Sequence, residues 1–458
     1  MIVEKIKIGE IIGSRYDNSY VRYRHKAGSY KYPVVALRDL LIDKPQYGSG
    51  EAGVPRTNHN LPRYIRITDI DEYGLLSDDF GVTASKIESK FFLNEDDILI
   101  ARSGNTVGKS YIHKKKVVNE SCLYAGYLIR FVIDPKKVLP EYVYVFTKLS
   151  PFTEWIKVTQ RITGQPNINA EEYGSLSIPI PPIAIQQEIC KIYLKALRER
   201  QCNLSKAKQK LDWINDYLLD VLDIDSNGND VTSLGEVRVN KISMVIGKRL
   251  DVSFYKGRFE MRSSKYPNYE LSALVDMDAT ISFRSLDKDM LVSFIPMECI
   301  DEKYGEIAEC RETTISNTKG YTKFRENDLL WAKISPCMQN GKSAIARNLK
   351  NGFGCGSTEY FVLRPKNEEA ILIDYIYLLL RHKELLKAAQ SALGGTAGQQ
   401  RVSMEYLKSK LIPVPEISIQ KEIVKTVSAA KKYAKQLEAE GDTLIDDAKR
   451  RIEQLIMK

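Results

Sequence analysis

The feature that most constrains this chain is an internal repeat, in which the second half of the sequence restates the first in the same order. A Gly-Gln joint, a proline-rich stretch and a short segment near the start of each copy all recur after 234 positions. The matching segments are Gly164–Ile168 and Gly398–Val402, Ile178–Ile189 and Ile412–Ile423, and Arg15–Asp17 and Arg249–Asp251. Several matches in one order with one separation are not expected by chance, so the chain is predicted to hold two copies of one unit.

Within each copy, short apolar runs broken by Gly, Asp and Asn predict strands and turns over about the first 180 residues. The expected strands include Phe91–Leu93, Ile98–Ala101, Tyr127–Val132 and Tyr360–Leu363. A helix is expected late in each copy, starting at Glu141 and at Asp374. Proline then interrupts the chain at Pro179–Pro182 and Pro413–Pro415, because its ring prevents a helix from continuing. Each copy is therefore expected to be a mixed α/β domain followed by a hinge.

After each hinge the hydrophobic period becomes helical. Leucines recur every seven residues in the first copy, and apolar residues alternate at spacings of four and three in the second, with Gly441 as the interruption. The predicted packing positions are Leu197, Leu204, Leu211 and Leu218 in the first helix and Val427, Leu437, Leu444 and Leu455 in the second. A long amphipathic helix alone would expose its apolar stripe, so the two helices are expected to pack on each other. Contact of the stripe with another protein is the alternative.

The predicted fold is α+β: two tandem mixed α/β domains joined by two long antiparallel helices that form a coiled-coil spacer, with pseudo-two-fold symmetry. The predicted boundaries are 1–180 and 235–413 for the domains, 181–224 and 414–458 for the helical spacers, and 225–234 for a linker. Two similar surfaces held apart by a rigid spacer suit a target that has its own approximate two-fold axis and a fixed repeat, as duplex DNA does. A bivalent scaffold that binds proteins would have the same layout.

Composition narrows the functional classes. The net charge of +9 favours a polyanionic partner only weakly, because many proteins of similar charge bind none. Seven cysteines without a C-x-x-C pair and four dispersed histidines argue against a disulfide framework, a metal site and a Ser-His-Asp triad. No apolar run approaches the length of a membrane span, and the first residues lack a secretion signal, so a cytoplasmic location is expected.

Further segments accompany the repeat in a fixed order. They are the joint Thr163–Ile168 with Ile178–Ile189, Tyr47–Gly50 followed by Tyr64–Ile70, and Glu95–Leu99 followed by Gly108 and Lys109. Together with the two-copy layout, these segments resemble type I restriction-modification specificity subunits over essentially the whole chain. The second copy departs from the pattern, because it has Asp278–Arg284 where the first has the Tyr-Gly-Ser loop. The second copy is therefore expected to use different loops for recognition.

The resemblance implies two target recognition domains, each reading one half of a split double-stranded DNA sequence, with the helices setting the gap. It implies that the chain has no catalysis of its own and binds no cofactor. The implied partners are methyltransferase subunits, two in number, that use S-adenosylmethionine, and restriction (motor-nuclease) subunits that use ATP and Mg²⁺. A specificity subunit of a type IIB-like methylation system is the related alternative. A self-sufficient nuclease or methyltransferase is an alternative of another class.

The DNA-binding candidates gather at turns that the two copies share. They are Tyr47, Ser49, Arg102, Ser103, Asn105, Lys109, Lys114 and Lys115 in the first copy and Lys333, Ser335, Gln339 and Lys342 in the second. Arginine and lysine can bond guanine edges or phosphates, and amides and hydroxyls can bond base edges. The alternatives are solvated lysines, and Ser or Asn side chains that cap their own turns. Four joint residues are expected to fix the corner before the helix rather than to contact DNA: Gln165, Asn167, Gln399 and Arg401.

An enzyme would need a catalytic or nucleotide-binding element. Ser103–Ser110 nearly matches a nucleotide-binding P-loop, but the motif needs glycine where Ser103 stands, and Pro336 occupies the corresponding place in the second copy. A polar turn between two strands is predicted instead. No Asn-Pro-Pro-Tyr or Asp-Pro-Pro-Tyr element for adenine methylation is present. The sequence thus indicates a recognition chain rather than an enzyme.

Overall fold

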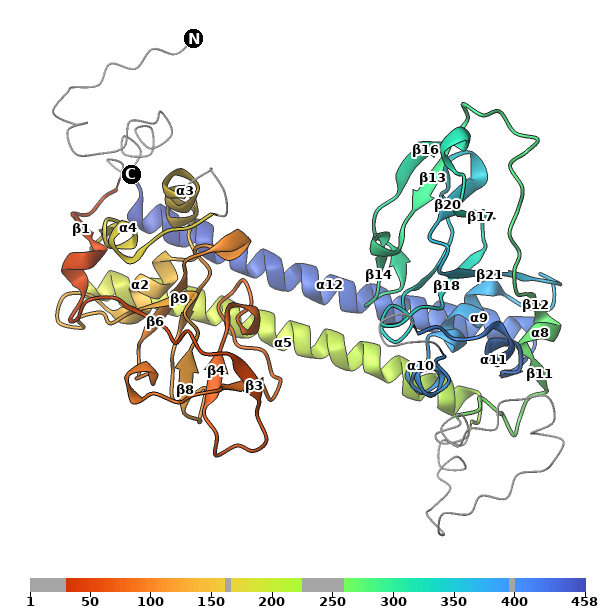
Figure 1. Cartoon of the computed structure of the whole chain (residues 1–458), viewed down its shortest axis with the longest axis horizontal. Coiled ribbons are helices and arrows are strands. Elements are labelled where there is room, and N and C mark those ends of the chain that lie inside the picture. Colours follow the sequence, from red (N-terminus) through yellow and green to blue (C-terminus); the bar gives the residue numbers. More distant parts are fainter. Residues whose placement is uncertain (1–29, 161–165, 225–258, 395–399) are drawn as a thin grey trace. The chain divides into compact units, whose positions relative to one another are not determined.

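The computed structural model describes residues 30–160, 166–224, 259–394 and 400–458. The chain divides into two compact units: unit 1 comprises Met1–Leu204 with Glu438–Lys458, and unit 2 comprises Ser205–Leu437. Each unit takes its globular part from one copy of the repeat and a helical segment from the other copy (Figure 1). Some predicted features lie outside the described residues: the Arg15–Asp17 and Arg249–Asp251 match, the linker 225–234, Gln165 and Gln399.

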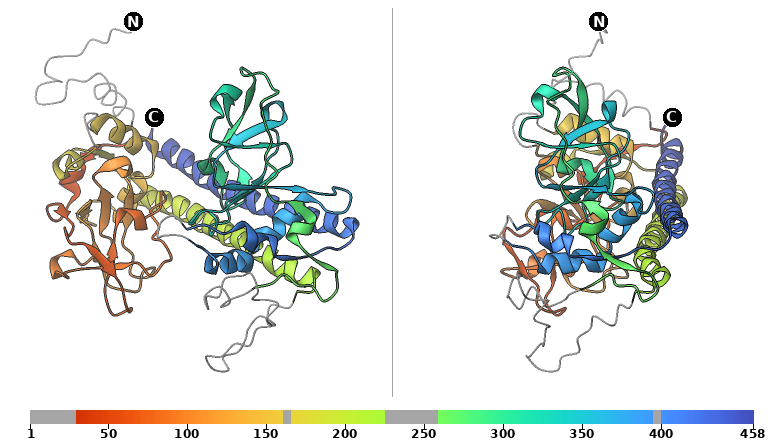
Figure 2. Two further views of the ribbon diagram at one scale, coloured as in Figure 1. Left: turned by 45° about the vertical axis from the view of Figure 1, so that its right-hand side comes forward. Right: turned by 90° about the vertical axis from the view of Figure 1, so that its right-hand side faces the viewer.

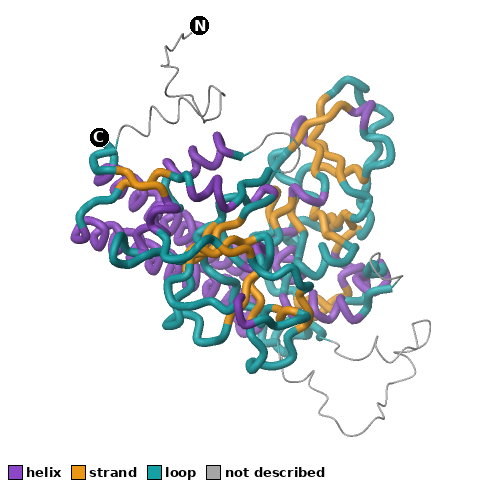
Figure 3. The backbone as a smooth tube through the Cα atoms, turned by 60° about the vertical axis from the view of Figure 1, so that its left-hand side comes forward, coloured by secondary structure: helices purple, strands orange, loops and turns teal. Residues whose placement is uncertain are grey.

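Unit 1 combines short strands, helices and long loops, three kinds of backbone that Figure 3 colours differently along the chain. Its four-stranded sheet has the order β2–β9–β6–β7, in which β6 is antiparallel to both neighbours and buried along its whole length. The strands are β1 (Val34–Ala36), β2 (Gln46–Tyr47), β3 (Gly53–Pro55), β4 (Arg63–Ile65), β5 (Val82–Ala84), β6 (Ile98–Ala101), β7 (Ser110–Ile112), β8 (Cys122–Tyr124), β9 (Leu128–Phe131) and β10 (Ser177–Pro179). Burial on both faces explains why β6 is an uninterrupted apolar run.

The helices of the first copy begin where the local sequence favours a start. They are α2 (Pro140–Phe146), α3 (Ser150–Thr159) and α4 (Ala170–Gly174), preceded by the 3-10 turns η2 (Leu37–Leu40), η3 (Ile67–Asp69), η4 (Ser89–Phe91) and η5 (Gly104–Thr106). Proline occupies the first turn of α2 and of α3, where its missing N–H costs no hydrogen bond. Asn169 and Glu172 form a capping box at α4, each accepting the other's backbone N–H. These helices pack with β6 and β9 in one hydrophobic core.

Unit 2 has a corresponding four-stranded sheet, ordered β12–β21–β18–β19, and a second four-stranded sheet, ordered β16–β13–β20–β17. The strands are β11 (Asn268–Glu270), β12 (Val275–Asp276), β13 (Leu291–Ile295), β14 (Ile300–Asp301), β15 (Glu306–Ile307), β16 (Arg311–Thr314), β17 (Thr322–Arg325), β18 (Leu329–Ala332), β19 (Ser343–Ile345), β20 (Phe353–Gly356), β21 (Tyr360–Pro365) and β22 (Leu411–Pro413). The helices and 3-10 turns are α8 (Leu271–Leu274), η7 (Met297–Cys299), η8 (Ile315–Asn317), η9 (Lys350–Gly352), α9 (Ile373–Leu380), α10 (Lys383–Ser391) and α11 (Met404–Lys408). The strands of unit 2 lie on one side of its long helical segments (Figure 2).

Corresponding elements confirm the predicted repeat. β1 and β11, β10 and β22, and the two long helices each begin 234 positions apart, and α2 and α9 begin 233 positions apart. The strands predicted at Ile98–Ala101, Tyr127–Val132 and Tyr360–Leu363 are confirmed as β6, β9 and β21. The helices predicted to start at Glu141 and Asp374 are confirmed as α2 and α9, each beginning one residue earlier.

The strand predicted at Phe91–Leu93 is wrong. Ser89–Phe91 forms the 3-10 turn η4, in which the Phe91 N–H donates to the Glu88 carbonyl at 3.1 Å. Phe91 and Leu93 are buried, so the apolar run does reach the core, but it reaches it from a turn. A run of three apolar residues is too short for its periodicity to distinguish a buried turn from a strand.

The two long helices are continuous, as the heptad pattern predicts: α5 spans Ile183–Val221 (39 residues) and α12 spans Ile417–Ile456 (40 residues). In unit 1, Tyr193 of α5 shares a core with Ile452 of α12, and in unit 2 Leu218 of α5 shares a core with Val427 of α12. α5 begins in unit 1 and ends in unit 2, whereas α12 does the reverse, so the helices are antiparallel. The predicted packing of the two helices on each other is confirmed.

The predicted packing positions differ in burial. Leu197, Leu218, Val427 and Leu437 are buried, and Leu204, Leu211, Leu444 and Leu455 are partly buried. Near the end of α12 the centre of the buried stripe lies one residue further along, at Ile445, Ile452 and Ile456. An α-helix has 3.6 residues per turn, so a seven-residue pattern drifts by about 20° per repeat and the buried stripe moves to the next position.

Gly441, the interruption in the apolar pattern, contacts Arg200 of α5 within unit 1. A Cβ at Gly441 would lie 3.0 Å from Arg200 Cγ and 3.5 Å from Arg200 Cα. The Arg200 Nε donates to Asp442 Oδ1 at 2.9 Å, and its guanidinium lies 3.6 Å from the centroid of the Tyr73 ring. Arg200 is therefore held from two sides and cannot move away freely.

We expect Gly441→Leu to lower the free energy of unfolding of unit 1 by about 2 kcal/mol, because the larger side chain overpacks this contact. Gly441→Ala should change it by less than about 1 kcal/mol, because a better helix propensity offsets mild crowding. Hydrogen–deuterium exchange of the α12 segment measures both effects. Equal protection in the two variants would show that the contact at Gly441 is loose.

Candidate nucleic-acid interface

In unit 1, the end of β6 meets the joint that precedes α4. The Arg102 N–H donates to the Tyr127 carbonyl at 3.0 Å, and the Ile168 N–H donates to the Arg102 carbonyl at 2.9 Å. The Gly104 N–H donates to the Pro166 carbonyl at 2.9 Å. We call residues 102–104, Tyr127 and 166–168 the β6 corner. Two motifs that sequence reasoning treated separately, the polar turn and the Gly-Gln joint, are thus neighbours.

Unit 2 has the same arrangement at the end of β18. The Lys333 N–H donates to the Glu359 carbonyl, the Val402 N–H donates to the Lys333 carbonyl, and the Ser335 N–H donates to the Gln400 carbonyl, each at 2.9 Å. We call residues 333–335, Glu359 and 400–402 the β18 corner. In both units the backbone of the joint is thus bonded to the end of the preceding central strand, while the side chains of Asn167 and Arg401 are at least partly accessible.

The side chain of Arg102 rests on an aromatic ring. Its guanidinium carbon lies 4.9 Å from the centroid of the Tyr47 ring, and the Tyr47 hydroxyl accepts the Ala170 N–H at 3.1 Å. Arg102 Nε is buried without a hydrogen-bond partner among the described residues. A guanidinium on an aromatic face keeps a defined orientation and retains donors for a planar acceptor pair. The structure thus brings together Tyr47 and Arg102, two residues predicted to contact DNA.

In the β18 corner, charged side chains meet around Glu359. Arg401 donates to the Glu359 carboxylate through Nε at 2.9 Å and through a terminal nitrogen at 2.7 Å. The bonds from Arg401 lower the pKa of Glu359, and the nearby charge of Lys333 lowers it further. The Lys333 ammonium also lies 5.3 Å from the Phe361 ring centroid, as Arg102 lies over Tyr47. Glu359 is therefore an ionised acceptor.

Three predicted DNA contacts have structural partners. Ser49 is buried, and its hydroxyl accepts the Glu51 N–H at 3.2 Å. The Lys109 ammonium donates to the Ile67 carbonyl at 3.4 Å, and the Lys342 ammonium donates to the Met297 carbonyl at 3.2 Å. The two lysines thus tie the same turn to the same neighbouring segment in both units. That DNA phosphates contact these lysines stays a prediction.

Lys114 and Lys115 lie apart from the β6 corner. The Lys114 ammonium contacts Asp96 and Glu141, the latter at 2.5 Å, and Glu95 at 3.8 Å. Carboxylates around this lysine already balance its charge, which argues for a role in tying the turn to α2. Lys115 is exposed, and its backbone N–H donates to Glu95 at 2.8 Å.

The predicted polar candidates differ in accessibility. Asn105 is exposed in η5, and the Ser103 side chain makes no capping bond to that turn, so the capping alternative does not describe Ser103. In unit 2 the Ser335 hydroxyl donates to Gln339 Oε1 at 3.1 Å. These side chains are half-buried or exposed and remain candidates for contacting a ligand.

Sequence reasoning missed Tyr127 and Glu359. Both lie in the turn before the strand that pairs with β6 or β18, and Tyr127 is 63% exposed. Aligning the two copies of the repeat could have found them, because they occupy corresponding places in the two copies and differ in side-chain chemistry. A position that keeps its backbone role and changes its side chain is a candidate for specificity.

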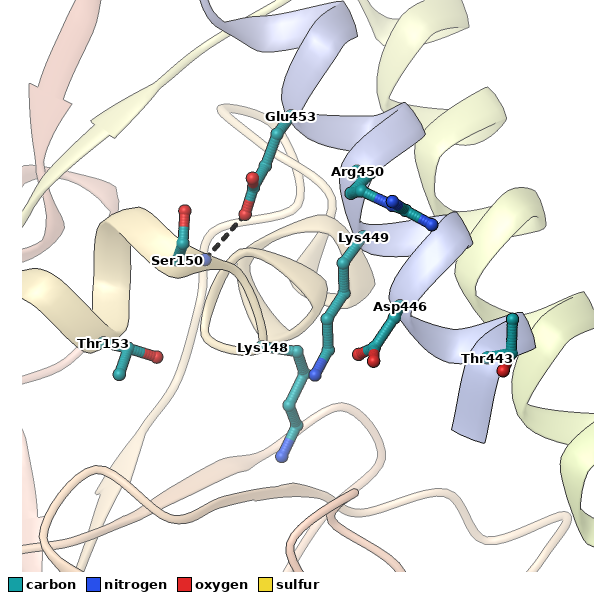
Figure 4. A pocket seen from close by; sticks show the side chains of 8 residues that line it. All are labelled: Lys148, Ser150, Thr153, Thr443, Asp446, Lys449, Arg450 and Glu453. Atoms are coloured by element: carbon teal, nitrogen blue, oxygen red, sulfur yellow. Dashed lines mark hydrogen bonds between the residues drawn. The ribbon is translucent and has the colours of Figure 1, made fainter. Parts of the chain in front are cut away.

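A cleft in unit 1 lies between α12 and the corner from α2 to α3 (Figure 4). Glu453 of α12 accepts the Ser150 N–H at the start of α3 at 2.7 Å, so a carboxylate already occupies that helix end. Burial lowers the pKa of Lys148 to about 7, and its ammonium donates to the Ser110 carbonyl at 2.8 Å. The cleft thus lies where the last part of α12 packs within unit 1, and none of the residues predicted to contact DNA line it.

Other kinds of site were searched over the described ranges. No three His, Cys, Asp or Glu side chains in that part of the chain lie close enough together to hold a metal ion. No helix within those ranges combines the length and apolarity that crossing a membrane requires.

Comparison with known proteins shows which family the sequence matches. The family described as "Type I restriction modification DNA specificity domain" matches residues 64–211 and again residues 292–443. The type I restriction enzyme EcoEI specificity subunit of Escherichia coli is 35% identical over 175 residues, which cover 37% of this chain and 29% of that protein. The EcoAI specificity subunit of the same species is 36% identical over 177 residues, with the same coverage. The matched part of this chain thus spans 29% of the length of each relative.

A solved structure shares the fold. It comes from work described as the structural basis of complex assembly and conformational transition of the type I R-M system. Its chain aligns with a TM-score of 0.51 and 13% identity over 93% of this chain and 97% of that chain. The two domain matches coincide with the two copies of the repeat and cover more than half of the sequence. The chain therefore belongs to the family of type I restriction-modification specificity subunits.

Proposed function

We propose that this chain recognises a bipartite sequence in double-stranded DNA, with each unit reading one half. The observation that carries the proposal is that both units present the same backbone corner with different side chains, all of them at least partly accessible. A shared backbone with differing contacts is what two readers of different half-sites require. In this proposal, residues 1–180 and 235–413 are the recognition domains, 181–224 and 414–458 are the spacers that set the gap, and 225–234 is the linker.

The partners of the chain belong to the same proposal. Methyltransferase subunits that use S-adenosylmethionine, and restriction subunits that use ATP and Mg²⁺, would carry the chemistry, and this chain would direct them to their target. Family membership supports this division of labour.

Replacing residues 1–180 with the corresponding domain of another family member is expected to change one half of the recognised sequence and to leave the other half unchanged. The reason is that the contacts of each corner are made within one unit. Methylation sequencing of a host that carries the chain and its partner subunits gives both halves directly. A change in both halves, or in neither, contradicts the assignment of one half-site to each unit.

The purified chain alone should bind DNA but show no methylation or cleavage when supplied with Mg²⁺, ATP and S-adenosylmethionine. Its DNA affinity should fall steeply with salt, because phosphate contacts release counterions. Turnover by the chain alone would show that it is an enzyme. Protein binding that resists salt, with no affinity for DNA, would favour the bivalent scaffold.

A further inference from the structure

Three positions in each unit share one backbone arrangement and differ in side chain. Arg102, Tyr127 and Asn167 are linked through the backbone bonds of the β6 corner, and Lys333, Glu359 and Arg401 hold the same places in the β18 corner. The bridges Ser103–Asn167 and Ile334–Arg401 place the joint in the same register in both units. We call each set of three a corner triplet.

Other hydrogen bonds of the two units are repeated, whereas the triplet side chains differ. Tyr142 of α2 and Tyr375 of α9 both donate to the last residue of the strand before a long helix, at 2.6 and 2.8 Å. Lys109 and Lys342 likewise make the same kind of bond in both units. The two units therefore share these internal hydrogen bonds and differ in the side chains of the triplets.

The triplet side chains are accessible to different extents, and that of Glu359 keeps 21% exposure beside Arg401. Tyr127 is 63% exposed, Asn167 is exposed, and the Arg401 side chain retains 41% of its exposure while it bonds Glu359. Arg102 has a terminal guanidinium fork supported by the Tyr47 ring, without an ion pair to any described carboxylate. Both corners thus offer polar groups to a ligand from a hydrogen-bonded backbone.

We infer that the corner triplets determine which base pair each unit reads at one position of its half-site, an inference that rests on the proposed DNA recognition. In unit 1, Arg102 would donate to guanine O6 and N7, or Asn167 would bond adenine. In unit 2, Glu359 can accept from the cytosine amino group and Arg401 can donate to guanine, so this triplet reads a G·C pair.

The charges of the triplets permit a clean test. Arg102, Tyr127 and Asn167 carry one net positive charge, and so do Lys333, Glu359 and Arg401. Exchanging one set for the other therefore leaves the charge of the corner unchanged, and with it the attraction to phosphates. Any change in the recognised sequence then comes from base contacts.

The experiment places the second triplet in the first unit, as R102K/Y127E/N167R in the full chain with its partner subunits. Methylation sequencing is expected to show one altered position in one half-site, where a G·C pair becomes preferred. Competition binding to duplexes that differ at that position should show a change in preference of about 5- to 150-fold. The salt dependence of DNA binding should stay as in the unaltered chain.

The reciprocal exchange, K333R/E359Y/R401N, is the matched control, because it should alter the other half-site and leave the first unchanged. The single variant Tyr127→Glu, at an exposed position, tests the inference if the triple variant does not fold. Retained binding with an unaltered sequence preference in these variants overturns the inference and leaves the proposed function intact. If the unaltered chain selects no DNA sequence, the proposed function fails, and the inference fails with it.

Discussion

Replacing Gln420 by leucine is expected to destabilise unit 2 by about 3 kcal/mol. Gln420 is fully buried near the start of α12, where its Oε1 accepts the Leu372 N–H at 3.0 Å. Its amide nitrogen donates to the carbonyls of Ala370 and Pro415 at 3.0 and 2.9 Å. Leucine has a similar volume and would leave these three backbone groups without partners, at about 1 kcal/mol or more each. Hydrogen–deuterium exchange of unit 2 in the full chain measures the loss.

The repeat supplies a ranked comparison and a matched control. Gln186, the counterpart in α5, bonds the Leu139 N–H at 2.9 Å and the Pro181 carbonyl at 2.8 Å, so Gln186→Leu should cost about 2 kcal/mol in unit 1. The neighbouring Gln187 is exposed, so Gln187→Leu should change stability by less than about 0.5 kcal/mol. If Gln187→Leu costs as much as Gln186→Leu, the buried amide is not what fastens the helix to its unit.

Asp328→Ala should destabilise unit 2 by about 3–5 kcal/mol, because it removes one partner of a buried ion pair. Asp328 is fully buried just before β18 and accepts two bonds from Arg364 of β21, both at 2.7 Å. It also accepts the Arg325 N–H at 2.8 Å. The variant leaves the Arg364 guanidinium, whose side chain is only 18% exposed, with no counter-charge. Urea unfolding followed by peptide-resolved hydrogen–deuterium exchange separates this loss from any change in unit 1.

Glu312→Ala is the control for this prediction. Glu312 pairs with Lys350 at 3.3 Å, but both side chains are close to half exposed, so the pair should contribute less than about 1 kcal/mol. If Glu312→Ala and Asp328→Ala lower the free energy of unfolding by a similar amount, the burial of Asp328 does not make its ion pair more important for stability.

The candidate site was only partly predictable. The repeat located both corners, since Arg102 and Lys333 are immediately before polar turns at matching places. It did not separate Ser49, which is buried, from Tyr47, which is 38% exposed and supports Arg102. Local sequence determines that a turn forms, but solvent access depends on which distant segments cover it.

Residues in the motifs that resemble the family mostly make internal bonds that hold the fold, and they do not indicate which side chains contact a ligand. Asp97, in the segment that resembles the family, is buried, lies 3.5 Å from Arg130, and accepts the Asn94 N–H at 2.8 Å. Gln186, in the joint motif, fastens α5. Two units can share such residues whatever each unit contacts, because the same backbone needs the same internal bonds. The side chains that differ between the copies are therefore the better candidates for recognition.

The sequence by itself determined the two-copy organisation, the places of α5 and α12, the buried strand β6 and the prolines that precede each long helix. These features are periodic or local, so the order of residues along the chain is enough to specify them. Only the tertiary structure decided that Arg102 rests on Tyr47, that Glu359 bonds Arg401, and that Gly441 is where α12 contacts Arg200. Each of these pairs joins segments separated by tens to hundreds of residues, and their meeting depends on how the strands pair and how the core closes.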